Sequence, residues 1–360
     1  MKTKRKSIQK NRFALLFLAM GFLTLGSCSS DDDSVTVDDG TTTEEGTTTD
    51  EDTTTDDVDE TSSEECVQQP VVSGSGECGV TLTLTQEVSI TVDGDTRTIE
   101  TNNIPDHLVG EFRNSEVIAQ ENTYRITTNP EFTGELISLE GDNGPEYQFG
   151  ILLSGIELDP IAAEPWPHSE DGIMDENVNW DWNLEALTAP IGLDCNFAHV
   201  QPTGKYHQHG APTLYDLIED AQGDSMVQVG WAADGYPIYY KFAFSDPDDS
   251  TSVVEEMESS YQLRTGNRPG DGVTAPCSEY NGAYSADYEY IEGLGDLDET
   301  NGRTGVTPEF PNGTYYYILT DGDSFPSIPR AFRGTPSDDF LQGGNAPTVG
   351  GGGPGGMGMM

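Results

Sequence analysis

Three closely spaced histidines have the residue type and spacing of a metal site. His199 precedes the segment "GKYHQHGAPT", Gly204 to Thr213, which holds His207 and His209. Side chains two apart on a strand point to the same face, so a strand through this segment would set His207 beside His209. Imidazole nitrogens suit zinc and copper, whereas calcium and magnesium prefer oxygen ligands. The segment therefore predicts a transition-metal site for copper or zinc.

The turn between His199 and His207 determines whether the third imidazole joins this face. Pro202 suits the second position of a type I turn, and Gly204 suits the left-handed residue that closes a three-residue hairpin loop. With such a loop, His199 faces His207. Opposed residues have Cβ atoms about 4.5 to 5.5 Å apart, close enough for their nitrogens to share one ion. We therefore predict that three imidazoles converge.

Other residues complete the predicted site or compete with it. His107 is far away in sequence but free to fold back as a fourth ligand, and Tyr206, Asp194 and Asp234 are expected to support the site. The alternative is a structural cluster of rings that hydrogen-bond to Tyr206, Asp194 or backbone carbonyls. His168 lies in an acidic, proline-rich loop and is expected to be exposed. The chain has no GxSxG, P-loop, GxGxxG or HExxH motif, and the sequence assigns no catalytic residue.

The ends of the chain predict export and a lipid anchor. Residues 1–27 have the basic start and apolar run of a signal peptide, and they end in "LGSC", which resembles a bacterial lipobox with Cys28 as the lipidated residue. Residues 28–75 have the acidic, threonine-rich composition of a disordered tether, and residues 343–360 form a glycine-rich tail. We expect an outer-membrane lipoprotein at the cell surface, or alternatively on the periplasmic face. The lipid would be its only contact with the membrane.

The charge of the chain argues against one class of partner. Its formal net charge is −48, from 64 acidic and 16 basic residues. Such a chain has too few cations to neutralise phosphates, so nucleic acid is not expected as a partner. The same charge keeps the protein soluble through self-repulsion.

Four cysteines remain after Cys28, and an even number in an exported chain predicts disulfides. Four cysteines allow three pairings. We favour Cys66 with Cys78, which would pin the tether to the edge of the domain, and Cys195 with Cys277. The alternative is a Cys195 thiol that acts as a nucleophile, which an oxidising compartment disfavours.

Residues 76–342 have the pattern of one mainly β domain. The run Val80 to Gln86 alternates like a strand, and Asp93-Gly94 and Asp234-Gly235 separate runs that predict hairpins. A helix of three turns is expected from a Thr213 N-cap to Gly223. We predict an antiparallel β-sandwich or irregular barrel with long loops and a few short helices, because alternating helices are missing.

Long segments of this domain resemble the bacterial YHYH-domain proteins, whose motif stands here as "YHQH", Tyr206 to His209. The matching stretches are "TNNIPDH", "DPIAAEPW", "LDCNFAHVQPTGKYHQHGAPT", "VGWAADGYPIY", "YQLRTGNRPG", "DLDETNGRTGVTPEFPNGTYYYILTD" and "FPSIPRAFRGTP". The resemblance places motif histidines at His107, His199, His207 and His209 and implies a shared role for them. It implies no established activity.

The chain departs from the pattern of this family at four positions. Gln208 replaces the second tyrosine, and Phe197 stands where close relatives carry another histidine. Thr300 and Ala331 stand where the family has cysteines, which is what the loss of one disulfide would look like. On this resemblance, a Cys195 to Cys277 bridge would replace the lost disulfide.

Two functional hypotheses follow from the sequence. The first is a lipid-anchored domain with a copper or zinc site at His199, His207 and His209, with His107 as fourth ligand. The second is a non-catalytic surface module that binds an extracellular glycan or protein, in which the histidines are structural. Whether the protein is an enzyme is left open.

Overall fold

The computed structural model describes residues 66–72, 74–112, 116–168, 177–219, 221–322 and 324–342. The predicted signal peptide, Cys28 and the predicted tail lie outside these residues, as does most of the predicted tether. Within the described residues, no helix is long and apolar enough to span a bilayer.

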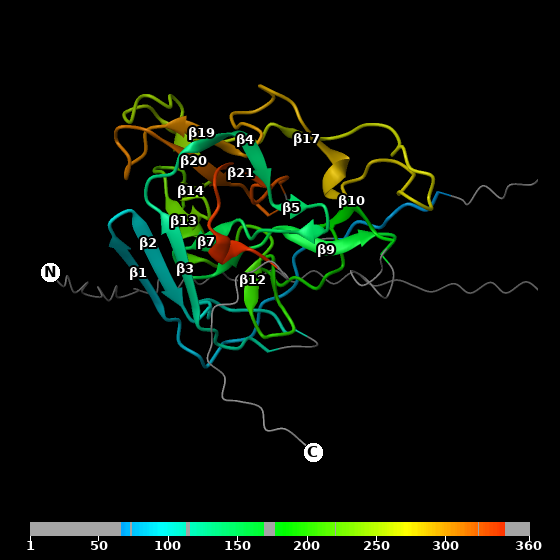
Figure 1. Cartoon of the computed structure of the whole chain (residues 1–360), viewed down its shortest axis with the longest axis horizontal. Coiled ribbons are helices and arrows are strands. Elements are labelled where there is room, and N and C mark those ends of the chain that lie inside the picture. The colour runs from blue at the N-terminus through cyan, green and yellow to red at the C-terminus, as the bar shows by residue number, and fades with distance from the viewer. Residues whose placement is uncertain are drawn as a thin grey trace, which may run out of the picture. The chain divides into compact units, whose positions relative to one another are not determined.

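A sheet of eight strands forms the centre of the domain (Figure 1). In spatial order its strands are β11 (Ala198–Val200), β12 (Tyr206–Gln208), β8 (Glu157–Leu158), β7 (Gly150–Leu152), β13 (Gln228–Ala232), β14 (Pro237–Tyr240), β20 (Thr314–Leu319) and β19 (Gly302–Gly305). The mainly β prediction is confirmed. The sheet is nevertheless mixed, because β12 pairs with β8 and β14 pairs with β20 in parallel.

A second sheet packs on this one and closes the core. It consists of β1 (Val88–Asp93), β2 (Thr96–Thr101) and β3 (Asn122–Thr127), beside β13 and β7 in Figure 1. The predicted hairpin at Asp93-Gly94 is confirmed, with Gly94 at φ +58°. Ile99 and Ile126 of this sheet share one buried cluster with Ile151 of β7. Burial of such a side chain stabilises the fold by roughly 1.5 to 3 kcal/mol.

Short two-stranded sheets and single helical turns surround the two main sheets. The pairs are β4 (Phe132–Ser138) with β21 (Ala331–Gly334), β5 (Glu140–Gly141) with β6 (Gly144–Pro145), β9 (Ile161–Trp166) with β10 (Asn179–Glu185), β15 (Phe242–Phe244) with β16 (Val254–Glu256), and β17 (Tyr261–Leu263) with β18 (Tyr288–Tyr290). The helical turns are α1 (Asp216–Glu219), η2 (Ser285–Asp287) and η3 (Asp338–Phe340).

Two local predictions were wrong. The helix expected from Thr213 to Gly223 is reduced to α1, because the Thr213 hydroxyl donates to the Cys195 carbonyl instead of capping the helix. The run Val80 to Gln86 forms no strand. Only Val80 pairs, in a single bridge with Val109, so the alternating side chains have no neighbouring strand to continue along.

The predicted disulfide pairing was also wrong. Cys66 is bonded to Cys277, and Cys78 is bonded to Cys195. The reason is the path of residues 66–72 and 74–80, which together we call the N-terminal strap. The strap runs extended along two distant loops, with the Gln68 side chain donating to the Glu279 carbonyl and the Val72 amide donating to the Thr188 carbonyl.

The strap lies so close to the second loop that it needs glycine. A Cβ atom at Gly74 would lie 1.9 Å from the carbonyl oxygen of Leu187. An extended strap holds its two cysteines apart, so each pairs with the loop beside it. The strap is therefore fixed covalently at both ends.

Candidate metal centre

The hairpin of β11 and β12 brings two histidines face to face, as predicted. His199 pairs with His207, and the Gln201 amide donates to the Lys205 carbonyl over 3.0 Å. Gly204 closes the three-residue loop at φ +85°, the left-handed region that favours glycine. The odd length of this loop is what sets His199 on the same face as His207.

The third histidine follows directly after β12, where its backbone amide donates to the Phe197 carbonyl over 2.8 Å. The Nε2 atom of His209 lies 3.1 Å from Nε2 of His207 and 3.1 Å from Nε2 of His199. One nitrogen from each of the three rings lies within 4.8 Å of the others. The structure thus confirms that three imidazoles converge and can hold a metal ion.

The protons on these rings cannot satisfy both short contacts. Nδ1 of His199 lies 3.2 Å from the Ile191 carbonyl, and Nδ1 of His207 lies 3.4 Å from the Lys205 carbonyl. A carbonyl oxygen only accepts, so both Nδ1 atoms carry the proton of a neutral ring and both Nε2 atoms present lone pairs. His209 has one Nε2 proton at most and can donate it to only one of them. At least one of the two contacts therefore lacks an aligned hydrogen bond, and a shared cation would supply the missing partner.

Burial favours the neutral form of all three rings, the form that binds metal. His207 and His209 are 2% and 3% exposed, and burial lowers the pKa of each well below its usual value. Burial also lowers the pKa of His199, which is partly exposed. The neighbouring imidazoles lower the pKa of His207 and His209 further, because two cations cannot share this space.

The nitrogen geometry fits a small transition-metal ion. Ligands at about 2.0 to 2.1 Å from a tetrahedral metal lie roughly 3.3 Å from one another. The two 3.1 Å separations are close to that value. Binding would move the His209 proton to Nδ1, which now makes no hydrogen bond and has the Pro160 carbonyl as its neighbouring acceptor. Three protein ligands would leave one tetrahedral position open.

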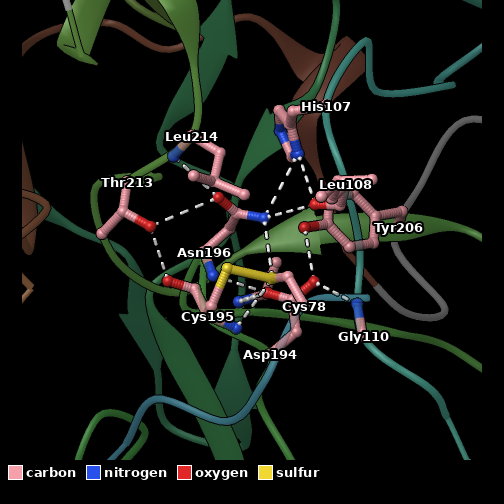
Figure 2. The surroundings of a disulfide bond; sticks show 11 residues. Cys78, His107, Leu108, Gly110, Asp194, Cys195, Asn196, Tyr206, Thr213 and Leu214 are labelled. Atoms are coloured by element: carbon pink, nitrogen blue, oxygen red, sulfur yellow. Dashed lines mark hydrogen bonds between the residues drawn. A yellow bond between two sulfur atoms is a disulfide. The ribbon is translucent and has the colours of Figure 1, made fainter. Parts of the chain in front are cut away.

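His107 is not brought to this cluster. Its Nδ1 lies 3.2 Å from Nδ2 of Asn196, and its ring packs edge-on against Tyr206 (Figure 2). Tyr206 and His207 are adjacent on β12 and point to opposite faces of the sheet. The prediction of His107 as a fourth ligand therefore lacks geometric support.

His168 is not exposed, contrary to prediction. It is half-buried, it stacks on Tyr284 with ring centroids 5.6 Å apart, and its Nε2 lies 3.2 Å from the Tyr284 hydroxyl. Burial lowers the pKa of His168. The contact joins residues far apart in sequence, which the local composition could not indicate.

Asp194 holds the hairpin from the face opposite the histidines. Its carboxylate accepts from the Tyr206 hydroxyl over 2.9 Å and from the backbone amides of Gly110, Asn196 and Ala198 (Figure 2). These bonds join β12 to the segment that leads into β11. The adjacent Cys78–Cys195 disulfide attaches the same segment to the strap. Asp194 is therefore a positioning residue for His199.

Replacement of Asp194 by asparagine should destabilise the domain by about 2 kcal/mol. An amide has one acceptor oxygen, so its NH2 group would face donors that the carboxylate now accepts. Denaturant unfolding would measure the loss. The exposed Asp216→Asn change is the matched control and should alter stability little. Equal stability of the two variants would contradict the role of Asp194.

The predicted supporting residue Asp234 serves another part of the sheet. Its carboxylate accepts from the Tyr317 hydroxyl over 2.6 Å and from the Gly334 amide over 3.0 Å. Burial raises the pKa of Asp234 to about 6. None of its described hydrogen bonds reaches the three histidines, so Asp234 holds β20 and β21 together instead.

The sequence analysis missed two ion pairs beside the cluster. Glu157 stands opposite His207 in the parallel register of β8 and β12. Its carboxylate forms an ion pair with Lys205, whose ammonium lies 3.0 Å away. Arg330 binds Glu185 through both carboxylate oxygens and also donates to the Pro160 carbonyl. A lone glutamate within the apolar run "GILLSGIEL" was the available signal for Glu157. The Arg330 pair spans 145 residues and gives no local signal.

A second buried carboxyl lies directly after β8, beside the end of β12. The amide of Asp159 donates to the Gln208 carbonyl, and its carboxylate accepts from the Gln342 side chain over 2.8 Å. Burial raises the pKa of Asp159 from 3.8 to about 7. Between those values the folded state binds more protons than the unfolded chain. Stability therefore falls as the pH rises through this window, and the full penalty is present above about pH 7.

The Asp159→Asn variant should therefore be more stable than the parent at pH 8, by on the order of 4 kcal/mol, since each pKa unit corresponds to about 1.4 kcal/mol. The asparagine keeps an oxygen for Gln342 without the charge. Denaturant unfolding at pH 4, 6 and 8 would measure the difference. It should nearly vanish at pH 4, and a constant difference at all three values would contradict burial of the charge as its cause.

Comparison with known proteins supports the resemblance seen in the sequence. Residues 123–334, more than half of the chain, match the family described as YHYH protein. The matched span contains the three converging histidines, whereas His107 precedes it. No curated protein and no solved structure matches the chain. The chain therefore belongs to the YHYH protein family.

Proposed function

We propose that this protein is an exported lipoprotein whose β domain binds one zinc or copper ion through His199, His207 and His209. The observation that carries the proposal is the convergence of three Nε2 atoms, with those of His199 and His207 each 3.1 Å from that of His209 and too few protons to hydrogen-bond both contacts. All three ligands are neutral nitrogens, a donor set that suits both metals. A bound ion could act as a Lewis acid, or as a redox centre if it is copper.

The surrounding residues hold the ligands in place. The Ile191 and Lys205 carbonyls orient the rings of His199 and His207 by accepting from Nδ1, as outer-shell acceptors do in metal sites. The Lys205 charge is balanced by Glu157, and the Arg330 charge is balanced by Glu185. The centre itself therefore carries no uncompensated cation, among the described residues, that would repel a metal.

Metal analysis of the purified full chain would test this proposal. The protein is exposed to equimolar zinc and copper, desalted, and analysed for bound metal beside a His207→Ala, His209→Ala double variant. We expect about one ion per parent chain and none at this site in the variant. No retained metal in the parent would overturn the proposal, and the metal that is retained identifies the ion.

The proposed location rests on residues outside the described structure. Cys28 follows "LGS" after a signal-like segment, and an acidic run follows it. We expect the parent to fractionate with membranes and a Cys28→Ala variant to be released. Protease treatment of intact cells would then separate display at the cell surface from the periplasmic face, because only a surface protein is cleaved without permeabilisation.

A further inference from the structure

A cleft of about 780 Å³ borders the three-histidine cluster on one side. Among the three imidazoles only His199 lines it, together with Ile191, whose carbonyl accepts from the His199 ring. His207 and His209 are almost fully buried, whereas His199 is partly exposed. The cleft is thus a side on which the histidine cluster meets solvent, through His199.

The lining of this cleft is acidic. Its charged residues are Glu77, Glu111 and Asp194, and no lysine or arginine of the described chain lines it. Asp194 is buried and occupied by its four hydrogen bonds. Glu77 and Glu111 are exposed and form no ion pair within the described part of the chain, so among the described residues no cation balances their charges at the cleft.

The fold keeps these two carboxylates together on the wall. Glu77 directly precedes Cys78, which forms a disulfide with Cys195. The end of the strap also forms an antiparallel bridge between Val80 and Val109, two residues before Glu111. This antiparallel register sets Glu77 and Glu111 at the same end of the pairing. The acidic wall therefore has a fixed position relative to the segment that carries His199.

We propose that this cleft is the route by which a hydrated divalent transition-metal ion reaches the histidines, with Glu77 and Glu111 attracting the cation. The proposal rests on the proposed metal function. An acidic wall alone would indicate only solubility, but here His199, one of the three converging imidazoles, lines the same cleft. Uncompensated carboxylates in a cleft raise the local cation concentration and the rate of association, and salt weakens this effect.

The first test changes the charge of the wall. The apo form of the purified full chain is mixed with Zn²⁺, and the rate of uptake is followed by stopped-flow competition with a metallochromic chelator. A Glu77→Gln, Glu111→Gln variant should take up zinc about fivefold more slowly at low ionic strength, with the difference disappearing in about 0.5 M salt. The control is Glu131→Gln, Glu135→Gln, an equal charge change at or beside β4, which lies well away from β12 in Figure 1.

The second test narrows the cleft. Gly79 lines it, and a Cβ atom there would meet nothing within 4 Å, so larger side chains should fold without strain. Gly79→Leu should slow uptake severalfold at every salt concentration, whereas Gly79→Ala should change it little. Parent-like uptake rates in both the charge variant and the leucine variant would overturn the route while leaving the metal function intact. A parent chain that binds no zinc or copper would instead overturn the proposed function.

Discussion

Replacement of His209 by alanine should weaken metal binding by on the order of 10³-fold. His209 is the central ligand, since its Nε2 lies 3.1 Å from the Nε2 atoms of both other histidines. Its loss leaves two nitrogens, too few to hold an ion against hydration. A loss of about 4 kcal/mol corresponds to this factor. The measurement is the Kd for zinc and for copper by competition with a chelator of known affinity.

A matched control separates metal ligation from the general effects of removing a ring from the interior. His168→Ala removes an imidazole that is half-buried and likewise has a lowered pKa, but His168 stacks on Tyr284 and is not among the converging rings. We expect this variant to bind metal with the affinity of the parent. Parent-like affinity in His209→Ala, or an equal loss in both variants, would contradict the three-histidine site.

The change in Tm on adding metal provides a second measurement on the same variants. In the apo form at least one of the two 3.1 Å contacts lacks an aligned hydrogen bond, so the cluster is incompletely satisfied without an ion. Metal at a concentration that just saturates the parent should therefore raise the Tm of the parent and of His168→Ala. The same concentration should leave the Tm of His209→Ala nearly unchanged. This follows because a ligand stabilises the native state only to the extent that it binds there.

The convergence of the three histidines could be predicted from the sequence because it depends on residues close together in the chain. Pro202 and Gly204 specify the length of the loop, and loop length determines which residues of a hairpin face each other. His199 and His207 are therefore opposed because of residues that lie between them in the chain. His209 joins them through the two-residue period of a strand.

The surroundings of the site depend on contacts that local patterns do not encode. Glu157 reaches Lys205 because β12 lies parallel to β8, and parallel pairing has no turn that marks it in the sequence. The same holds for His107, which packs on Tyr206 because of the path of residues 101–110. An imidazole predicted to be free to fold back was thus placed on the opposite face.

The disulfides illustrate the same limit more sharply. Four cysteines allow three pairings, and the choice depends on where the strap lies. Cys66 and Cys78 would close the shortest loop, but the strap is held extended by backbone and side-chain bonds to loops far away in sequence. Gly74, whose Cβ would clash with Leu187, is consistent with this path but does not identify it from sequence.

Removal of the Cys78–Cys195 disulfide should weaken metal binding as well as stability. In a Cys78→Ser, Cys195→Ser variant, the opened loop spans 117 residues, and loop-closure entropy predicts a loss of about 5 kcal/mol in the free energy of unfolding. Cys195 is four residues before His199 and adjoins Asp194, so its release should also free the segment that positions the His199 ring. We expect the Kd for metal to rise about tenfold, the effect typical of losing support for one ligand.

The other disulfide is the matched control for this prediction. Cys66–Cys277 closes a loop of 211 residues, so a Cys66→Ser, Cys277→Ser variant should lose a similar amount of stability, again about 5 kcal/mol. It anchors the start of the strap, beside the contact of Gln68 with Glu279, and not the segment before His199. Metal affinity should therefore stay at the parent value. Chemical denaturation of the apo proteins and chelator competition would measure both quantities. An equal loss of affinity in the two variants would show that global loosening, and not the position of His199, couples the disulfide to the metal centre.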